Sequence, residues 1–184
     1  MKRLFFFFIF IPVFLSAQNS NLQWVHSLGR TSNDGGLSIV SDEFGNTYTL
    51  GFFHDSIDVD PDPNTKHILK SMGDIDLFVL KLDANGDFVW ATRFGGTDED
   101  YGDELVLIDD KIFVSGRFEL SFNVKVNFTS QTYQSKGYKD VFLMCMNTSG
   151  NVLWNRTFGG PASDYARGLT ADSLKNVYLT GSYR

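Results

Sequence analysis

Cysteine is nearly absent from this chain of 184 residues, because Cys145 is its one example. An intrachain disulfide is therefore impossible despite any export signal, and packing and hydrogen bonds must hold the fold. Histidine is also scarce, and His26, His54 and His67 are not spaced as metal ligands. The low numbers of cysteine and histidine exclude a domain stabilised by disulfides and argue against a metal centre with histidine ligands.

Clusters of basic side chains are missing as well. The chain has 16 Lys and Arg residues against 22 Asp and Glu residues, and its formal net charge is −6. An acidic surface without a basic patch repels phosphate backbones, so the composition argues against nucleic acid as a partner. The sequence contains no Gly-x-Ser-x-Gly elbow, and nothing marks out one carboxylate as an acid and another as a base. It therefore offers no catalytic residue and favours a protein that is not an enzyme.

Long apolar runs are confined to the N-terminus. The run from Leu4 to Leu15 follows the basic pair Lys2-Arg3 and precedes the small residues Ser16-Ala17. This layout predicts a secretory signal peptide over residues 1–17, and the run is short for a membrane span. An uncleaved N-terminal anchor is the alternative. We expect the remaining chain, 18–184, to be secreted, extracellular or at the cell surface, with no transmembrane segment.

No helical period of useful length occurs, and the sequence repeats instead. The block around Trp24 returns around Trp90 and again around Trp154, so one unit recurs about every 65 residues. Several turn residues return in the same register; Asp34, Asp42, Asn46, Tyr48 and Gly51 match Asp164, Asp172, Asn176, Tyr178 and Gly181. A repeat of this size indicates one supersecondary unit that is copied and stacked, because a single unit cannot bury its own apolar face.

Each unit contains short strand-like segments separated by turn residues. Thr47–Leu50, Leu77–Leu82 and Phe88–Phe94 are rich in β-branched and aromatic residues, and Asp83–Asp87 is a typical hairpin loop. Four antiparallel strands joined by hairpins predict a β-propeller blade. A β-solenoid is the competing all-β fold, but its rungs are shorter and lack a hairpin strand that carries tryptophan.

The predicted fold is an all-β propeller with antiparallel four-stranded blades of about 65 residues, present as an incomplete open arc. The units are an orphan fourth-type strand over 18–30, a first blade over 31–96, a second over 97–160 and a partial third over 161–184. Each full unit exceeds the usual blade length of roughly 40–50 residues. Ile57–Asp60 and Ile68–Ser71 are expected to form a small additional hairpin from the excess.

Two of the expected strands would have unpaired edges, Leu22–Leu28 at one end and Val177–Tyr183 at the other. Unpaired strand edges invite aggregation. We therefore expect a fragment of a longer protein, with further C-terminal blades that complete the ring.

The run from Asp76 to Ala91, closed by Phe94-Gly95-Gly96, resembles the bacterial β-propeller repeat labelled SBBP, as does the segment Phe44–Gly51. The resemblance extends over nearly the whole chain after residue 17. It implies a secreted or surface protein of Gram-negative bacteria, often exported by type IX secretion. It implies a scaffold rather than a particular ligand. The second copy departs from the first, with Asn123–Asn127 in place of Asp58–Asp62.

Asp58, Asp60 and Asp62 are the candidate metal ligands. Ca²⁺ takes several oxygen ligands, and alternate residues of a strand place carboxylates on one face. The segment is not an EF-hand loop, since it lacks the required glycine and the closing glutamate. Lys125 replaces Asp60 in the next copy, so the site would not repeat in every blade. A solvated loop is the alternative, and no other cofactor is predicted.

Other recurrent residues are interpreted as structural. The aspartates at the turns are expected to cap turn amides; they are Asp34, Asp76, Asp100, Asp140 and Asp164. The three tryptophans are expected to fill the space between blades, with sugar stacking as the alternative. Cys145 stands where the preceding copy has Lys81, which indicates a small strand residue rather than a reactive thiol.

The sequence as a whole favours a secreted, non-enzymatic scaffold for binding or adhesion. Its partner would be a protein or a glycan. The alternative is a propeller-type hydrolase or lyase that acts on extracellular polysaccharide, with its active-site blades outside this chain. Repeated aspartates and aromatics without a catalytic constellation favour binding.

Overall fold

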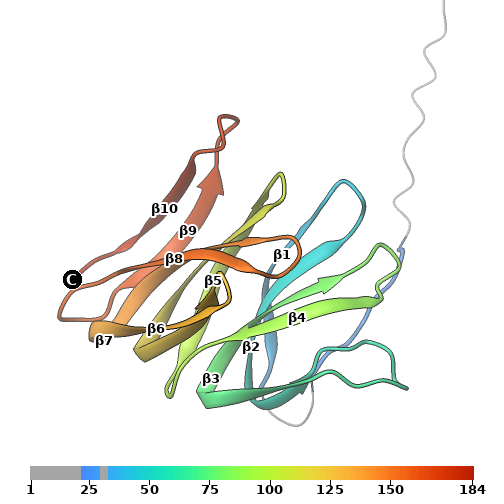
Figure 1. Cartoon of the computed structure of the whole chain (residues 1–184), viewed down its shortest axis with the longest axis horizontal. Coiled ribbons are helices and arrows are strands. Elements are labelled where there is room, and N and C mark those ends of the chain that lie inside the picture. The colour runs from blue at the N-terminus through green and yellow to red at the C-terminus, as the bar shows by residue number, and fades with distance from the viewer. Residues whose placement is uncertain (1–21, 30–32) are drawn as a thin grey trace, which may run out of the picture.

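The computed structural model describes residues 22–29 and 33–184 (Figure 1). The predicted signal peptide lies outside these residues. The described residues form ten strands and no helix. The strands are β1 (Gly35–Ser41), β2 (Thr47–Asp58), β3 (Ile68–Leu82), β4 (Phe88–Phe94), β5 (Asp100–Ile108), β6 (Lys111–Val126), β7 (Thr129–Asn147), β8 (Val152–Phe158), β9 (Tyr165–Ala171) and β10 (Val177–Ser182). Accordingly, this part of the chain contains no helix with the length and apolarity that a membrane crossing requires.

The strands form antiparallel meanders in three sheets. The first blade has the order β1-β2-β3-β4, the second has the order β5-β6-β7-β8, and β9 pairs with β10 in a third sheet. β1 contacts β5 and β5 contacts β9, so the first strands lie side by side, and β4 and β8 lie at the far edges of their sheets. Figure 1 shows the three sheets in succession without a closed ring. The all-β fold and the open arc of four-stranded blades are thus confirmed.

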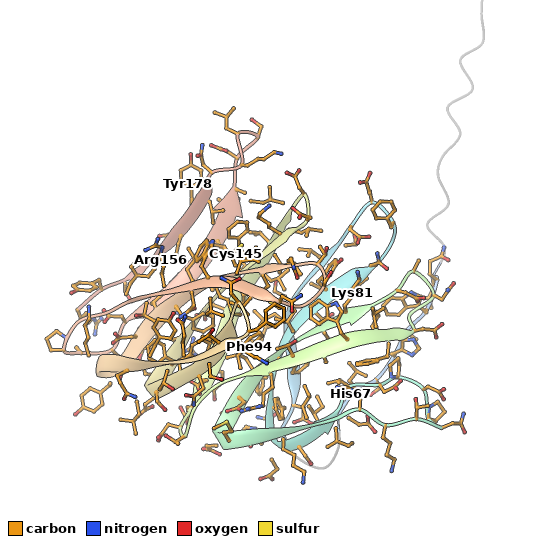
Figure 2. All side chains as sticks on the ribbon, viewed as in Figure 1. His67, Lys81, Phe94, Cys145, Arg156 and Tyr178 are labelled. Carbon is orange, nitrogen blue, oxygen red and sulfur yellow. The ribbon has the colours of Figure 1, made fainter. Side chains whose placement is uncertain are left out.

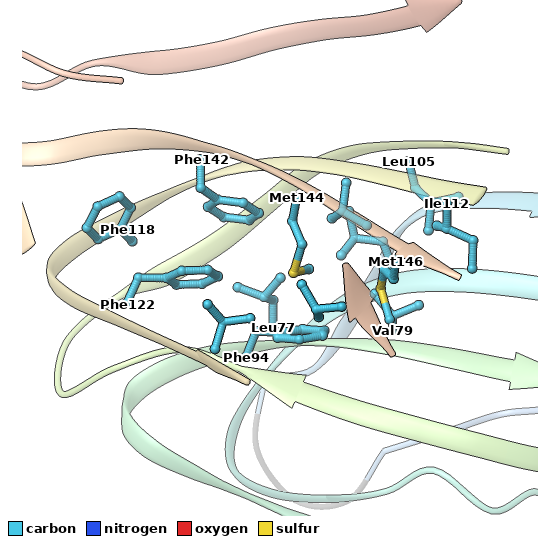
Figure 3. Packing of buried hydrophobic residues seen from close by; sticks show 14 of the residues in the cluster. Leu77, Val79, Phe94, Leu105, Ile112, Phe118, Phe122, Phe142, Met144 and Met146 are labelled. Carbon is cyan, nitrogen blue, oxygen red and sulfur yellow. The ribbon is translucent and has the colours of Figure 1, made fainter. Parts of the chain in front are cut away.

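The largest core lies between the two full blades. Leu77 and Val79 of β3 belong to the same buried cluster as Phe142 and Met144 of β7 (Figure 3). The intervening residues of β3, Phe78 and Leu80, are buried in a second cluster on the other face of the sheet. β3 is therefore buried on both faces, by the second blade on one side and by Trp24, Leu28 and the residues of its own lengthened hairpin on the other. A single blade would leave one of these faces in water, which explains why the unit occurs in repeated copies.

The excess residues of each unit lengthen the hairpin between its second and third strands. In the first blade Ser56, Ile57 and Asp58 pair with Lys70, Leu69 and Ile68. In the second blade the corresponding pairs run as far as Val126 and Thr129. The register shifts at Asp55 and Leu120, both of which have positive φ angles, 53° and 54°. Such a bulge bends the strand and re-aims the side chains beyond it.

The segment Leu22–Leu28 does not form the predicted orphan strand. The fourth strands β4 and β8 pair with β3 and β7 of their own blades. Among the described residues, no third strand pairs with residues 22–28 in this way. Trp24 and Leu28 nevertheless pack against the buried cluster of the first blade. The side chains thus occupy the position of a preceding fourth strand without its backbone hydrogen bonds.

Candidate binding grooves between the blades

Buried aspartates form each junction between blades. At the first junction Asp76 and Asp100 both lie against Gly95, whose φ of 145° and lack of a Cβ leave room for their carboxylates. Asp100 accepts a hydrogen bond from the Gly96 amide at 2.6 Å. Asp76 accepts one from Arg93 Nη1 at 2.5 Å. Both aspartates are fully buried, so the first junction is a sealed polar contact.

The second junction repeats this arrangement. Asp164 accepts a hydrogen bond from the Gly160 amide at 2.7 Å, and Asp140 accepts one from the Lys136 amide at 3.2 Å. Asp34, the equivalent of Asp164, accepts a bond from the His54 amide at 3.4 Å. These contacts join a glycine corner or a strand amide to the aspartate, as a structural role requires.

The junction carboxylates hold their protons more tightly than ordinary aspartates. Burial raises the pKa of Asp76 and of Asp140. Burial, reinforced by the charge of Asp76, raises the pKa of Asp100 to about 8. One oxygen of each of these three carboxyls has no hydrogen-bond partner among the described residues. Because these groups are at most 1 % exposed, the junctions lock the blades together and are closed to a substrate.

Partly exposed aspartates cap the hairpins between first and second strands. Asp42 accepts hydrogen bonds from the Asn46 amide at 2.9 Å and from the Tyr48 hydroxyl at 3.0 Å. Asp172 repeats both bonds with Asn176 and Tyr178 at 2.9 Å and 2.8 Å. The Asn176 side chain and amide, with Tyr178, lower the pKa of Asp172 to about 2. These carboxylates stabilise turns.

A tryptophan from one unit covers a hairpin loop of the next. Trp90 Nε1 donates a hydrogen bond to the Thr148 carbonyl at 3.1 Å, and its ring lies over Gly150. Trp24 Nε1 donates to the Ala84 carbonyl at 3.3 Å and lies over Gly86 in the same way. The tryptophans therefore link consecutive units, as the sequence predicts. Trp154 instead contacts Phe113 and Arg156.

Cys145 and Lys81 occupy equivalent places on β7 and β3 (Figure 2). Cys145 is buried and 1 % exposed, and burial raises the pKa of its thiol. Lys81 lies over the Tyr48 ring, 5.1 Å from its centroid, and donates to the Thr148 carbonyl. A buried thiol with a raised pKa is a poor nucleophile, so Cys145 has the role of a small strand residue.

The lengthened hairpins produce two equivalent grooves. The first groove has a volume of about 550 Å³ and lies between the segment 22–29 and the tip of the β2–β3 hairpin. His26, Asp60, Asp62 and Asp87 supply its charged or titratable side chains, and Phe88 its aromatic one. His67 packs against Phe88, with ring centroids 4.5 Å apart and ring planes tilted by 31°; Figure 2 labels His67.

The second groove has a volume of about 440 Å³ and lies between β4 and the β6–β7 hairpin. Phe94, Val124 and Val152 are buried core residues that also line it, and they supply an apolar floor. Its walls carry cations and uncharged polar groups; they include Arg93, Lys125, Asn123, Gln131 and Thr132. The groove is lined by no carboxylate.

The two grooves have equivalent positions but opposite charges. Lys125 in the second groove takes the place of Asp60 in the first. Lys125 pairs with Ser130 inside the ladder, whereas Asp60 lies in the loop beyond the end of β2. The repeat therefore maintains the four-stranded blade and varies both the length of the hairpin ladder and the chemistry of the opening.

Of the predicted metal ligands, Asp60 and Asp62 line the first groove, and Asp58 does not. Asp58 accepts the His67 amide at 3.0 Å, Asp60 accepts the Asp62 amide at 3.0 Å and Asp62 accepts the Asn64 amide at 2.9 Å. Among residues 22–29 and 33–184, no three His, Cys, Asp or Glu side chains converge as a metal site would require.

Calcium binding at Asp58, Asp60 and Asp62 stays a prediction, which calorimetry can decide. The expected result for a calcium site is heat on adding Ca²⁺ to the wild type and none with Asp60→Asn. Absence of heat in the wild type, or equal heats in both proteins, would reject the site.

Sequence reasoning missed Phe128, which lies at the rim of the second groove. The β6–β7 hairpin turns through Asn127 and Phe128, whose φ angles are 45° and 66°. Two-residue turns with both φ angles positive favour Asn-Gly. The sequence pattern that could have revealed this residue is the pair Asn127-Phe128 between two strands of alternating polarity. A bulky side chain is unusual at the second position of a two-residue hairpin turn.

Comparison with known proteins supports the repeat. The family model described as "Beta-propeller repeat" (SBBP) matches residues 154–182, from β8 to the end of β10. The protein named "Uncharacterized WD repeat-containing protein L264", from Acanthamoeba polyphaga mimivirus, is 21% identical over 185 residues. That alignment covers 87% of this chain and 13% of the mimivirus protein, so the chain spans a small part of that relative's length. Both matches support a β-propeller repeat scaffold.

Proposed function

We propose that this chain belongs to a secreted or surface-exposed protein of Gram-negative bacteria, and that it binds extracellular polysaccharide without cleaving it. Further C-terminal blades would complete the propeller. One observation carries the proposal: the framework residues repeat, whereas the side chains that line the two equivalent grooves differ in charge. Variation at the openings of a repeated scaffold is what a binding surface requires.

The distribution of the aspartates favours binding over hydrolysis. A glycosidase needs two carboxyl groups that flank a sugar bond in an accessible site. Here the pair Asp76 and Asp100 is fully buried, so a polysaccharide chain cannot contact it. Asp60 and Asp62, which line an open groove, accept hydrogen bonds from amides of their own loop. The hydrogen bonds that Asp60 and Asp62 accept give these two carboxylates a role in their own loop, which favours binding over hydrolysis.

The experiment is to run the purified chain through gels that contain individual extracellular polysaccharides, and to assay the same mixtures for new reducing ends. We expect retardation by at least one polymer and no release of reducing ends. Release of reducing ends would support a hydrolase or lyase instead. Absence of retardation by every polymer would contradict polysaccharide binding altogether.

A further inference from the structure

The second groove contains an exposed aromatic side chain that the fold maintains in an unfavourable conformation. Phe128 is 75% exposed, and its φ of 66° lies in the left-handed region. For a bulky residue this conformation is a genuine outlier. Strained backbone of this kind is retained where the surrounding structure enforces it, and it is concentrated at functional sites.

Neighbouring contacts hold the turn in place. The Asn127 amide donates to the Val152 carbonyl at 2.9 Å, and Asn127 Nδ2 donates to the Leu153 carbonyl at 3.1 Å. Val126 also forms a bridge with Val152. The tip of the β6–β7 hairpin is thereby attached to β8, and Phe128 projects from a fixed base. Its ring gains little from the fold, because most of it remains in water.

The chemistry around Phe128 matches an acidic sugar locally, because this groove is lined by two cations and by no carboxylate although the chain as a whole has a net charge of −6. An exposed aromatic ring offers an apolar face to the ring of a pyranose. The exposed Lys125 offers a charge to a carboxylate, and the amides of Asn123 and Gln131 offer donors and acceptors to hydroxyl groups. Asn123 Oδ1 already accepts the Thr132 hydroxyl at 2.7 Å, which fixes the orientation of that amide.

Arg93 contributes less charge than Lys125. Its Nη1 is paired with Asp76, and its Nη2 contacts Met72 Sδ at 3.0 Å. Lys125 is exposed and lines the groove, whereas its neighbours Val124 and Val126 are buried. The cation that a ligand would meet in this groove is therefore Lys125.

We infer that the second groove binds uronic-acid units of an anionic polysaccharide, with Phe128 stacked on a sugar ring and Lys125 paired with its carboxylate. This inference rests on the proposed polysaccharide-binding function and specifies its ligand. The first groove is an internal contrast, because Asp60 stands where Lys125 stands in the second. It would repel the same ligand.

The test is the affinity of the purified chain for polygalacturonate and for its fully methyl-esterified form, which has the same sugar ring without the charge. We expect the wild type to bind polygalacturonate about threefold more tightly than the ester, as one exposed ion pair allows. Phe128→Gly should weaken polygalacturonate binding about tenfold. Glycine is the residue that this turn favours, so the variant should melt no lower than the wild type.

Lys125→Asp provides a second variant, because it installs the residue of the equivalent position in the first blade. It should abolish the preference for polygalacturonate over the ester. Lys66→Asp is the matched control, since it makes the same change of charge in a loop that does not line the second groove. Phe44→Ala controls for exposed aromatics in general, because Phe44 is 76% exposed and also lies outside this groove.

The outcomes separate the two proposals. Equal binding of polygalacturonate by the wild type, Phe128→Gly and Lys125→Asp would overturn the assignment of the groove and leave polysaccharide binding intact. Equal binding of the polymer and its ester by the wild type would overturn the acidic ligand. If the wild type binds neither polygalacturonate nor its ester, this inference is overturned. If it also binds no other polysaccharide, the proposed function is overturned as well.

Discussion

At the scale of single residues, aspartate has two distinct roles in this protein. Partly exposed aspartates such as Asp172 cap turns, and their pKa is lowered by the hydrogen bonds that they accept. Buried aspartates such as Asp100 join blades, and their pKa is raised because the charged form is poorly solvated. The recurrence of these residues in the sequence predicts a structural role. The burial that distinguishes the two groups depends on the neighbouring blade, so it could not be predicted from one unit.

The junction aspartates predict an unusual dependence of stability on pH. The pKa of Asp100 in the folded chain is about 8, above the ordinary value of 3.8. The folded state therefore binds this proton more tightly than the unfolded state does. The resulting stabilisation is complete below about pH 4 and is lost as the pH rises towards 8. Asp100→Asn should remove this loss and raise the free energy of unfolding at pH 8 by about 1–3 kcal/mol.

Urea unfolding between pH 5 and pH 8.5 measures the effect, with Asp74→Asn as the control because Asp74 has a 67% exposed side chain. We expect the curve of free energy against pH to flatten in Asp100→Asn alone. Parallel curves for the wild type and both variants would show that Asp100 titrates as an ordinary aspartate.

At the scale of elements, the alternation of apolar residues predicts the strands well, because each blade buries both faces of its third strand. Two features escape such a prediction. The segment Leu22–Leu28 has the residues of a fourth strand, but the part of the chain that the structure describes contains no partner with which it forms a ladder. The irregularities at Asp55 and Leu120 shift the register at the start of the hairpin extensions. The residues that line the grooves follow from these irregularities and from the adjacent blade, so the sequence of one repeat does not identify them.

The contact between Trp90 and the β7–β8 loop predicts a sensitive position at Gly150. Its φ is 86°, and a Cβ there would meet the Trp90 ring at 3.1 Å. Gly150→Ala should lower the free energy of unfolding by about 1–2 kcal/mol, because it adds both backbone strain and crowding.

The matched control is Gly36→Ala on β1, where a Cβ would meet nothing within 4 Å. Substitutions without such a feature usually change stability by no more than about 0.5 kcal/mol. Equal urea midpoints for the two alanine variants would contradict the role assigned to the tryptophan link between blades.

At the scale of the whole molecule, the third sheet is the point of weakness. β2 and β6 pair on both edges, whereas β10 pairs only with β9 among the described residues. An apolar groove of about 380 Å³ beside this sheet is lined by Val141, Leu143 and Leu179 among other residues. Free strand edges beside apolar surface promote association. The purified chain should therefore self-associate as its concentration rises.

A charge on β10 should suppress this association. Thr180 is an exposed residue of β10, and Thr180→Lys places a cation at the free edge. Asn64→Lys, in the loop at the tip of the first hairpin, is the control for net charge. Light scattering across a concentration series should show smaller particles for Thr180→Lys alone. A monomeric wild type that melts cooperatively at every concentration would refute the prediction.

The central claim is that the blades share one framework and that the side chains in the grooves decide what is bound. The most direct measurement is polygalacturonate affinity of the double variant Asp60→Lys with Lys125→Asp, which exchanges two residues between equivalent positions and leaves composition and net charge unchanged. The account predicts a melting temperature within a few degrees of the wild type and loss of the preference for polygalacturonate over its methyl ester. Unchanged affinity and preference, or failure of the exchanged protein to fold, would contradict it.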